Sequence, residues 1–524
     1  MKQSYDAIVV GGGLAGLTSA AYLSRQGHKI LLCEKRNRTG GLVNSFQRDG
    51  FSFDAGIRAF ENSGILFPML KDLGLDIPFV NNPVTIGIDD QSIQLISKES
   101  LAQYIAMLTN IFPQEALGLQ QIQREIKNVM AYMDVIYGID NPMFLQKVEP
   151  AYLVKTLLPW LFKYQINIRK ASKLNQPVTD YLKRFTPNQA LIDMITQHFF
   201  RNTPAFFALS YFSLYLDYWY PTEGTGMLAS CMTKYIQTAG GLVKTGVGVC
   251  QLDAHNHQVH LDSGEVLSYQ KLIWAADQKT LYRVAKGVDA PAFQRQCALL
   301  KNSRGNDSIL TFYLGVDLAP DYFESRCGAH MFYTPGKRGI SSLPDWKQVA
   351  QLDGDGLLLW LSDYLETTTF EISCPALRNI ALAPKGKTGL IISTLMDYTF
   401  VKHLSDIGKY QQLKALATER ILSIFERHLF PGISKKVLFS LCSTPLTLEK
   451  ETSNFEGAIT GWSFTNPTMP CESRFRFMKK SIETAIPDIY QCGQWTFSPS
   501  GLPVSILTGK LAADQVHVSL KAVS

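Results

Sequence analysis

The chain has 524 residues, 46% of them hydrophobic and 18% charged, and this length predicts more than one domain because single hydrophobic cores rarely grow so large. A net charge of +6 at pH 7 is modest and does not favour nucleic-acid binding, which needs a concentrated basic face. Nine dispersed cysteines without a CxxC pair predict reduced thiols in a cytosolic protein, and nine histidines without ligand spacing predict no metal site.

The N-terminal segment "MKQSYDAIVVGGG" passes directly into a strand, so no signal peptide is expected. Uncharged apolar runs of about 18 residues are absent from the sequence, which predicts no membrane-spanning helix.

The first predicted elements are a strand, a glycine turn, a helix and a second strand. They cover residues 7–10, the GxGxxG glycines Gly11, Gly13 and Gly16, residues 14–25, and residues 29–33 followed by Glu34. The first glycine allows a tight turn, the second lets the backbone approach a pyrophosphate, and the third lets the helix pack on the strand. The helix N-terminus faces the phosphates. Glu34 is placed to accept hydrogen bonds from a ribose diol, which favours NAD or FAD over NADP.

The residues after Glu34 favour FAD. Arg36 and Arg38 precede a second glycine turn at Gly40 and Gly41, and this pattern suits a longer dinucleotide lying across the sheet. A hairpin-like loop with Gly56 follows. No second GxGxxG with its strand and acidic residue occurs in the sequence, which argues against a separate nicotinamide site.

Two segments in the middle of the chain, residues 199–220 and 147–184, each allow two interpretations. Residues 199–220 are dense in aromatic side chains, which is equally typical of a buried helical core and of an apolar tunnel. Residues 147–184 carry eight basic side chains against two acidic ones, interleaved with large apolar residues. This pattern is typical of a surface that rests on anionic lipid, and also of a solvated helix face.

Later elements point back to the nucleotide domain. Residues 224–277 predict a helix, a strand, a hairpin with His255 and His257 at its polar tip, and a further strand. Residues 310–317 and 389–398 predict strands of the other domain, and residues 504–516 predict a C-terminal helix.

Together these motifs resemble the flavoprotein superfamily of phytoene desaturases, carotenoid cis–trans isomerases and retinol saturases. The N-terminal motifs are shared widely with amine oxidases, whereas residues 372–394, residues 443–461 and "IPDIYQCGQWTFSPSGLPVSILTGKLAA" resemble segments of this superfamily more specifically. The resemblance implies an α/β, amine oxidase/GDI-like two-domain flavoprotein. A Rossmann-like FAD-binding domain would comprise residues 1–70, 224–290 and 445–524, and a discontinuous α+β substrate domain residues 71–223 and 291–444.

The resemblance also implies the cofactor contacts. The C-terminal glycine–proline loop would lie against the flavin ring, with the N-terminus of the next helix directed at the ring's pyrimidine edge, where negative charge grows on reduction. Leu42 departs from the Arg or Lys that the superfamily often has there. The implied FAD-binding residues are Gly11, Gly13, Leu14, Ala15, Gly16, Glu34, Lys35, Arg36, Gly40, Gly41, Leu42, Val249, Gly493, Gly501, Leu502, Pro503 and Val504.

The implied function is that of an FAD-dependent oxidoreductase acting on double bonds of a long apolar carotenoid, retinoid or other isoprenoid, by desaturation, saturation or isomerisation. Arg58 is the candidate catalytic residue, because it follows the loop that should approach the ring, although an ion-paired surface arginine fits the sequence equally well; Glu223 is a second candidate. Alternatives are a flavin amine oxidase, an unsaturated fatty-acid isomerase and a non-catalytic lipid-escort protein. We expect a cytoplasmic protein that contacts the inner face of a membrane through residues 147–184 and uses an external electron acceptor or donor.

Overall fold

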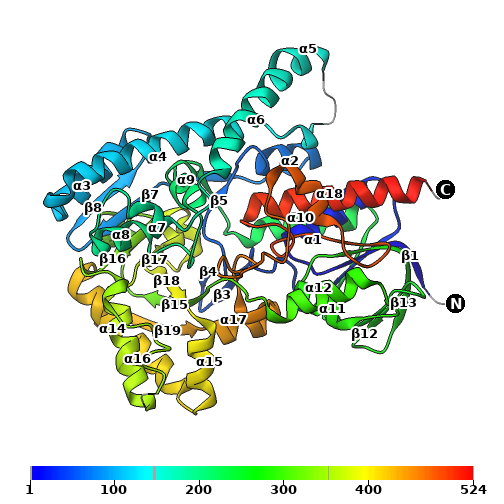
Figure 1. The fold of residues 1–524 in the computed structure, drawn as a ribbon. Helices are drawn as coiled ribbons and strands as arrows, with labels where there is room; N and C mark the ends of the chain where they lie inside the picture. Colours follow the sequence, from blue (N-terminus) through cyan, green and yellow to red (C-terminus); the bar gives the residue numbers. More distant parts are fainter. Residues whose placement is uncertain (1–2, 146–148, 352, 523–524) are drawn as a thin grey trace.

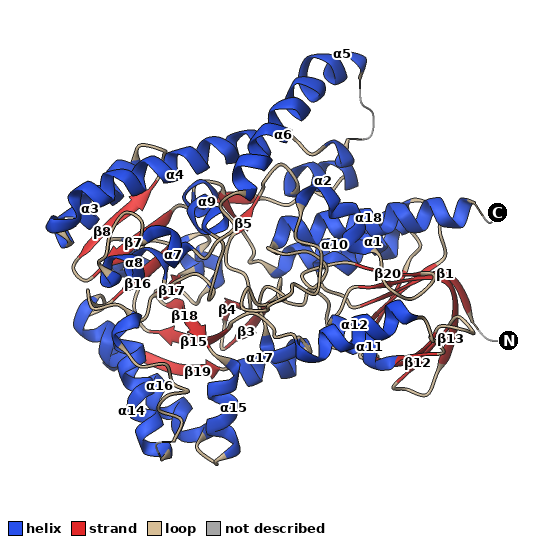
Figure 2. Ribbon diagram, in the orientation of Figure 1, coloured by secondary structure: helices blue, strands red, loops and turns tan. Residues whose placement is uncertain are grey.

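Two large β-sheets organise the computed structural model, which describes residues 3–145, 149–351 and 353–522. In Figure 2 the strands gather in two groups, one beside the chain termini and the other at the opposite end of the molecule, with helices around each. The first strand and the last helix lie in the same half, so both ends of the described chain are on that side of the molecule (Figure 1).

The first sheet has the N-terminal strand β1 near its centre. Its order is β10-β2-β1-β13-β12-β11-β14, with β20 also paired to β13. Strand β1 runs parallel to both β2 and β13, which confirms the predicted strand–helix–strand start. Residues 7–10 are buried because apolar clusters cover both faces of the sheet here, as is usual where strands are parallel. The bounds are β1 Ser4–Val10, β2 Ile30–Glu34, β10 Leu242–Thr245, β11 Val249–Asp253, β12 Gln258–Leu261, β13 Val266–Trp274, β14 Ala285–Lys286 and β20 Ile489–Gln491.

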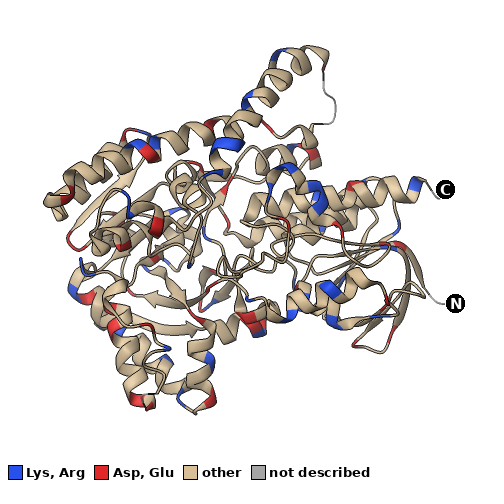
Figure 3. Cartoon of the chain, viewed as in Figure 1, with Lys and Arg blue, Asp and Glu red and all other residues tan. Residues whose placement is uncertain are grey.

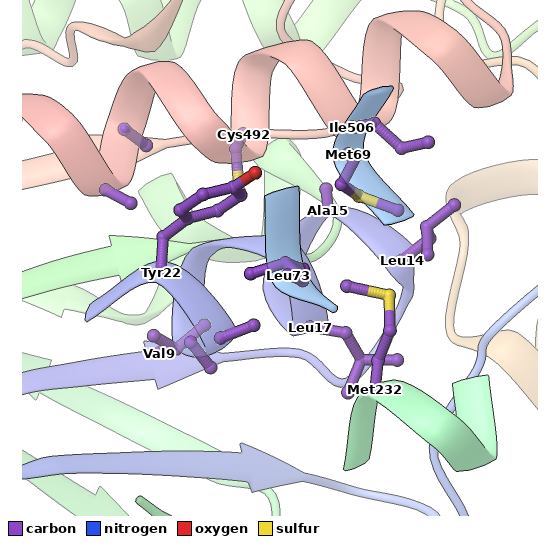
Figure 4. Packing of buried hydrophobic residues seen from close by; sticks show 14 of the residues in the cluster. Val9, Leu14, Ala15, Leu17, Tyr22, Met69, Leu73, Met232, Cys492 and Ile506 are labelled. Atoms are coloured by element: carbon purple, nitrogen blue, oxygen red, sulfur yellow. The ribbon is translucent and has the colours of Figure 1, made fainter. Parts of the chain in front are cut away.

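Helix α1 (Leu14–Arg25) is the centre of the core on one face of this sheet. Leu17 and Tyr22 pack there with Met69 of α2 (Leu66–Leu73), Met232 of α10 (Gly226–Thr238) and Ile506 of α18 (Figure 4). Because α1 is covered on several sides, nearly every one of its residues is buried.

The C-terminal helix α18 (Leu502–Lys521) lies directly on α1. The Ser19 hydroxyl donates a hydrogen bond to the Gly509 carbonyl at 2.9 Å, and a Cβ at Gly509 would lie 2.5 Å from the Ala15 carbonyl oxygen. The predicted C-terminal helix is confirmed, and it extends beyond both predicted ends.

The second sheet has seven strands in the order β19-β15-β18-β17-β16-β7-β8, and all neighbours are antiparallel except β16 and β7. The strands predicted at 310–317 and 389–398 are its central β15 and β18. Helices α14 and α16 cover one face through Leu361, Ile421 and Phe425. The bounds are β7 Val84–Ile88, β8 Gln91–Leu95, β15 Ser308–Val316, β16 His330–Thr334, β17 Phe370–Ser373, β18 Thr388–Met396, β19 Val437–Ser443, α14 Gly354–Thr367, α15 Tyr398–Asp406 and α16 Tyr410–His428.

A helical layer lies on the second sheet and has its own apolar core. Its helices are α3 Ser100–Ile111, α4 Ala116–Ile136, α7 Val178–Leu182, α8 Gln189–Thr196 and α9 Ala205–Tyr215. Two small sheets connect the halves: β3 Ser45–Arg48 with β4 Phe51–Asp54, and β5 Phe60–Glu61 with β9 Tyr218–Pro221 and β6 Phe79–Asn81. Apart from α5 and α6, which are described next, the other α-helices are α11 Gln278–Val284, α12 Pro291–Asn302, α13 Pro320–Glu324 and α17 Pro445–Thr452.

A helical arm projects from the body of the molecule (Figure 1). It consists of α5 (Pro150–Tyr152), a π-helical segment (Leu153–Leu157) and α6 (Leu158–Ser172). The Trp160 indole N–H donates to the Val135 carbonyl at 2.6 Å and so ties the arm to α4. None of the helices among the described residues is long and apolar enough to span a bilayer.

Candidate functional site

One cavity of about 1600 Å³ extends from the first sheet to the second. It is larger than the roughly 300–1,000 Å³ of a typical pocket for one small molecule. Its lining includes the turn after β1, the C-terminal loop, and the inner surfaces of α9, β16 and β17. The cavity therefore has room for a large cofactor and a second molecule.

The turn between β1 and α1 forms one end of the cavity. Gly11 has φ +105°, and a Cβ there would lie 2.8 Å from the Ala275 carbonyl oxygen, so only glycine fits. An added Cβ at Gly13 would meet nothing within 4 Å, so the backbone there borders open space. At Gly16 a Cβ would lie 2.0 Å from the Gly11 carbonyl oxygen, which makes this glycine a packing position that does not line the cavity.

Glu34 is fixed at the end of β2 by backbone donors. Gly12 N–H donates to its Oε2 at 2.6 Å and Arg36 N–H donates to its Oε1 at 2.8 Å. Burial raises the pKa of Glu34, while these N–H groups lower it. Each carboxylate oxygen keeps lone pairs that can accept from a diol.

The C-terminal loop and the start of α18 line the cavity beside this turn. Gly493 has φ +98°, and its N–H donates to the Thr508 hydroxyl at 3.0 Å, which ties the loop to its own helix. The first turn of α18 has no side-chain cap, and the buried Ser500 hydroxyl, which also lines the cavity, has no hydrogen-bond partner among the described residues. Polar groups without partners at a helix N-terminus fit an electron-rich ring edge.

The opposite end of the cavity, called here the aromatic chamber, is enclosed by a closed circuit of ring contacts. Centroid distances are 5.0 Å for Phe199–Tyr211, 5.4 Å for Tyr211–Tyr215, 5.3 Å for Tyr215–Phe332, 5.4 Å for Phe332–His198 and 4.0 Å for His198–Phe199. Helix α9 also packs its other side into the helical core, through residues such as Leu209 and Phe212. The aromatic run of residues 199–220 is therefore both core and cavity wall.

A buried polar network borders the chamber. The Arg58 side chain is only 3% exposed and forms an ion pair with Glu371. The alternative interpretation of Arg58 as a surface residue is therefore wrong. His330 Nε2 lies 3.0 Å from the other Glu371 oxygen, and its Nδ1 lies 3.2 Å from the Asn82 amide nitrogen. Since the amide nitrogen can only donate, His330 carries its proton on Nε2 and is neutral, in agreement with the lowered pKa that burial gives it.

Glu371 remains ionised inside this network. Burial by itself raises the pKa of this carboxyl, but Arg58 and His330 together lower it to about 2. Arg58 and Glu371 thus form a pair with no net charge.

Glu61 is a second carboxyl on the chamber wall, and it has no cationic partner among the described residues. Its Oε2 is buried without a hydrogen bond. Burial is the main cause that raises the pKa of Glu61 to about 7; its own backbone N–H acts against this shift and nearby Asp217 adds to it. By contrast, Glu223 is exposed and does not line the cavity, so it is not a site residue.

The sequence-predicted cofactor residues meet in this one cavity. All of them line it except Gly16, and Arg58 lines it too. No group of three or more His, Cys, Asp or Glu side chains suited to a metal occurs among the described residues.

A comparison with protein families now identifies the chain. The model of the family "Flavin containing amine oxidoreductase" matches residues 14–320, more than half of the sequence. The chain belongs to this family. It is therefore a flavin-dependent oxidoreductase, and the cradle of backbone groups around Gly13 and the C-terminal loop fits such a cofactor.

Curated relatives of this flavin-containing oxidoreductase extend over nearly its whole length. All-trans-retinol 13,14-reductase of Danio rerio is 24% identical and covers 94% of this chain and 83% of that protein. Prolycopene isomerase of Daucus carota is 23% identical (99% and 81%), and the lycopene-forming phytoene desaturase of Pantoea ananas is 22% identical (96% and 97%). The resemblance to the carotenoid desaturase and isomerase group is thereby confirmed.

Solved structures show the same fold. Reduced UDP-galactopyranose mutase matches with a TM-score of 0.58 and 14% identity, over 99% of this chain and 96% of that one. Putrescine oxidase bound to putrescine matches with a TM-score of 0.60 and 12% identity, over 98% and 99%. The predicted two-domain flavoprotein fold is confirmed.

Sequence reasoning missed Glu61, His198, His330 and Glu371. Glu61, His330 and Glu371 lie on three different strands and His198 in the turn between α8 and α9, and no motif connects them. A weak signal existed for His330 and Glu371, because each sits in a short apolar strand where a charged or titratable residue needs a buried partner.

Replacing Gly13 with leucine is expected to abolish flavin binding while the protein still folds. The new side chain would enter the open space beside the turn without touching protein atoms within 4 Å of its Cβ. Absorbance near the flavin bands, compared with circular dichroism of the same sample, measures both properties. Gly336→Leu is a matched control, since a Cβ there also meets nothing within 4 Å, its φ is not positive and it does not line the cavity. Normal flavin content in folded Gly13→Leu would contradict the assignment.

Replacing Glu61 with glutamine is expected to change how stability depends on pH. The folded-state pKa of about 7 lies above the ordinary 4.5, so the folded state binds the proton more tightly, and stability falls as pH rises from 4.5 to 7. The loss is on the order of 3 kcal/mol. Glutamine does not titrate. The free energy of unfolding of the wild type, measured in urea, should therefore fall relative to that of Glu61→Gln as pH rises over this range. Parallel curves would show that Glu61 does not hold its proton in the folded state.

Proposed function

We propose that this protein is an FAD-dependent oxidoreductase acting on the double bonds of a long apolar polyene or other isoprenoid lipid, such as a carotenoid or retinoid, by desaturation, saturation or cis–trans isomerisation. The observation that carries the proposal is the single cavity that runs from the dinucleotide cradle to the aromatic chamber. The curated relatives named for retinol, prolycopene and phytoene support the substrate class.

The residues proposed to bind FAD divide into two groups. Gly11, Gly13, Glu34, Arg36 and Val249, with their neighbours, would hold the ADP half, and the loop from Gly493 to Val504 would hold the ring. Bound FAD would supply hydride exchange with a substrate carbon. The chain contributes the oriented N-terminus of α18, the exclusion of water by the aromatic wall, and the positioning of the substrate. We also propose that residues 1–70, 224–290 and 445–524 form the FAD-binding domain and that residues 71–223 and 291–444 form the substrate domain.

The charges of the chamber disfavour the amine oxidase alternative. A protonated amine needs an uncompensated carboxylate in a dry site. Glu371 is already paired with Arg58, and the raised pKa of Glu61 favours its neutral form up to about pH 7. A fatty-acid isomerase would need a free cation for the substrate carboxylate, and Arg58 is engaged by Glu371. A non-catalytic lipid-escort protein would not need the C-terminal loop that is proposed to contact the flavin ring.

Flavin spectroscopy with a substrate panel tests the proposal. Oxidised protein is mixed anaerobically with carotenoids, retinoids, unsaturated fatty acids or amines, and loss of the flavin absorbance shows oxidation of the added compound. Chemically reduced protein is then incubated with the same compounds, and chromatography detects saturated or isomerised products. Conversion of a polyene in either state is expected, whereas rapid bleaching by small amines alone would replace the proposal with the amine oxidase alternative.

We also propose that the helical arm contacts the inner face of a membrane from the cytoplasm. Six of the fourteen exposed large hydrophobic side chains among the described residues lie on it: Leu153, Val154, Leu158, Leu161, Phe162 and Ile166. Exposed basic residues lie beside them on the arm and just after it, including Lys163, Arg169, Lys170 and Lys173 (Figure 3); Lys147 of the predicted stretch lies outside the described residues. The arm packs on α4, whose end contributes Met133 and Tyr137 to the cavity lining, so an apolar substrate could pass from lipid to the chamber.

Charge reversal of Lys163, Arg169, Lys170 and Lys173 to glutamate is expected to weaken binding to anionic liposomes by at least about a hundredfold, since each basic residue near an anionic surface contributes about 1 kcal/mol. Flotation assays measure the binding, and flavin content should stay unchanged. Reversal of four exposed lysines outside the arm, Lys286, Lys301, Lys385 and Lys435, is the matched control. Equal losses in both variants would point to overall charge and not to the arm.

A further inference from the structure

The wall of the aromatic chamber carries polar groups that have no partner in the protein. Glu61 Oε2 and the Tyr215 hydroxyl are buried without a hydrogen bond, and so are Nε and Nη2 of Arg58. His198 and the Tyr211 hydroxyl also make no hydrogen bond to any described residue, and both side chains are partly exposed where they line the cavity. Buried polar groups are normally satisfied, so a concentration of free ones in one place indicates a molecule that completes them.

These groups lie together on one wall. Tyr211 and Tyr215 lie on successive turns of α9, with ring centroids 5.4 Å apart. Glu61 and Glu371 are both near enough to Tyr211 for their charges to raise its pKa. His198 joins the same wall through Phe199 and Phe332. A hydrocarbon filling the chamber would cover all of them and leave them unsatisfied.

The chamber carries no net charge below about pH 7. Arg58 and Glu371 cancel each other. Burial lowers the pKa of His198 to about 4 and raises the pKa of Tyr211, so both are uncharged. Glu61 keeps its proton up to about pH 7, because it is buried and faces Asp217. An ionic group entering this space would lose its hydration without gaining a counter-ion.

A neutral oxygen function satisfies such a wall best. A hydroxyl can accept from Arg58, Tyr211 or protonated Glu61 and donate to a ring nitrogen of His198 or to a carboxyl oxygen. An ammonium group cannot accept a hydrogen bond, and a carboxylate would face the carboxyl of Glu61.

We propose that Glu61, Tyr211, Tyr215 and His198 form a subsite for a neutral oxygen-bearing end of the polyene, an alcohol or a carbonyl, and that this subsite selects such substrates over hydrocarbons, amines and acids. The inference rests on the proposed function. It specifies the chemistry of the substrate's end group and the residues that recognise that group.

The test uses one polyene with different end groups on the flavin-loaded protein. All-trans-retinol, its hydrocarbon analogue axerophthene, retinylamine and retinoic acid are titrated in the dark without oxygen, and quenching of tryptophan fluorescence gives each Kd. The alcohol is expected to bind about tenfold or more tightly than each of the other three. Equal affinity for alcohol and hydrocarbon, or tightest binding of the amine or the acid, overturns the subsite.

Single substitutions locate the preference. Tyr211→Phe and Glu61→Leu should each reduce the advantage of the alcohol over the hydrocarbon, while Tyr104→Phe removes a buried hydroxyl that does not line the cavity and should leave it unchanged. An undiminished preference in Tyr211→Phe and Glu61→Leu contradicts the assignment of the subsite.

The pH dependence of binding gives an independent readout. The titratable groups that face Glu61 are Tyr137 at the end of α4, Tyr211 of α9, and Asp217 and Tyr218 at the start of β9, and none of them is basic. Affinity for the alcohol should therefore fall as pH rises through about 7 in the wild type and stay level in Glu61→Gln, which keeps a neutral hydrogen-bonding group. A level profile in the wild type contradicts the role of Glu61.

The subsite and the proposed function fail in different ways. Tight binding and turnover of the hydrocarbon with no advantage for the alcohol removes the subsite alone. A flavin-loaded protein that binds none of these ligands, and converts none of the polyenes, removes the proposed function itself.

Discussion

A chain that ends at Gln491 is expected to lose flavin binding and stable folding together. The missing segment contains the C-terminal loop and α18, which buries Leu502, Ile506, Leu507, Val516 and Leu520 against α1 and its neighbours. Each large aliphatic side chain contributes about 1.5–3 kcal/mol when buried. Five of them amount to about 8–15 kcal/mol, which is comparable to the roughly 5–15 kcal/mol by which a typical domain is stable.

Expression of the truncated chain beside one that ends at Lys521 measures this effect. The longer chain keeps the whole of α18 and should remain yellow and folded. Solubility, flavin absorbance and thermal unfolding are compared for both. A stable, flavin-containing protein ending at Gln491 would contradict the position of α18 in the core.

Replacing Arg58 with methionine is expected to destabilise the protein by about 3–5 kcal/mol, the usual effect of removing one partner of a buried ion pair. The reason is that Glu371 loses its cationic partner: with Arg58 gone, only the neutral His330 contacts it. The carboxyl must then either stay charged without a counter-ion or take up a proton, and both cost free energy. Methionine has a similar length and fills the space, so packing loss contributes little.

A double variant separates charge from volume. Arg58→Met combined with Glu371→Met removes both charges and should recover most of the lost stability in urea unfolding, because a well-packed apolar pair often replaces a buried ion pair at little cost. If the double variant is as unstable as Arg58→Met, then Arg58 stabilises the fold through contacts other than Glu371.

The half of the site that could be predicted from the sequence is local in the chain. Gly11, Gly13 and Glu34 lie within one strand–helix–strand unit, and each residue type there follows from what a dinucleotide requires of the backbone. The C-terminal loop is predicted by resemblance, and the fold explains it, since α18 buries its apolar side in the cluster that surrounds α1.

The other half is created by tertiary packing. Glu61 and Glu371 are far apart in the sequence, and whether a carboxyl is ionised depends on which neighbours the fold brings to it. Arg58 shows the same limit: the sequence could not distinguish a surface ion pair from a residue at the site, and it is a buried ion pair at the site. One side of helix α9 packs into the helical core and the other lines the cavity. Its aromatic content alone therefore could not distinguish a buried core helix from a tunnel wall.

The packing of α18 on α1 also affects how the protein is made. Helix α1 leaves the ribosome before its partner α18, which follows 477 residues later by the separation of Arg25 and Leu502. At about 5–20 residues per second, translation of that interval takes roughly half a minute to a minute and a half. During this time the side of α1 that α18 covers in the folded protein has no partner. A site that includes the loop before α18 is complete only after that loop has been made.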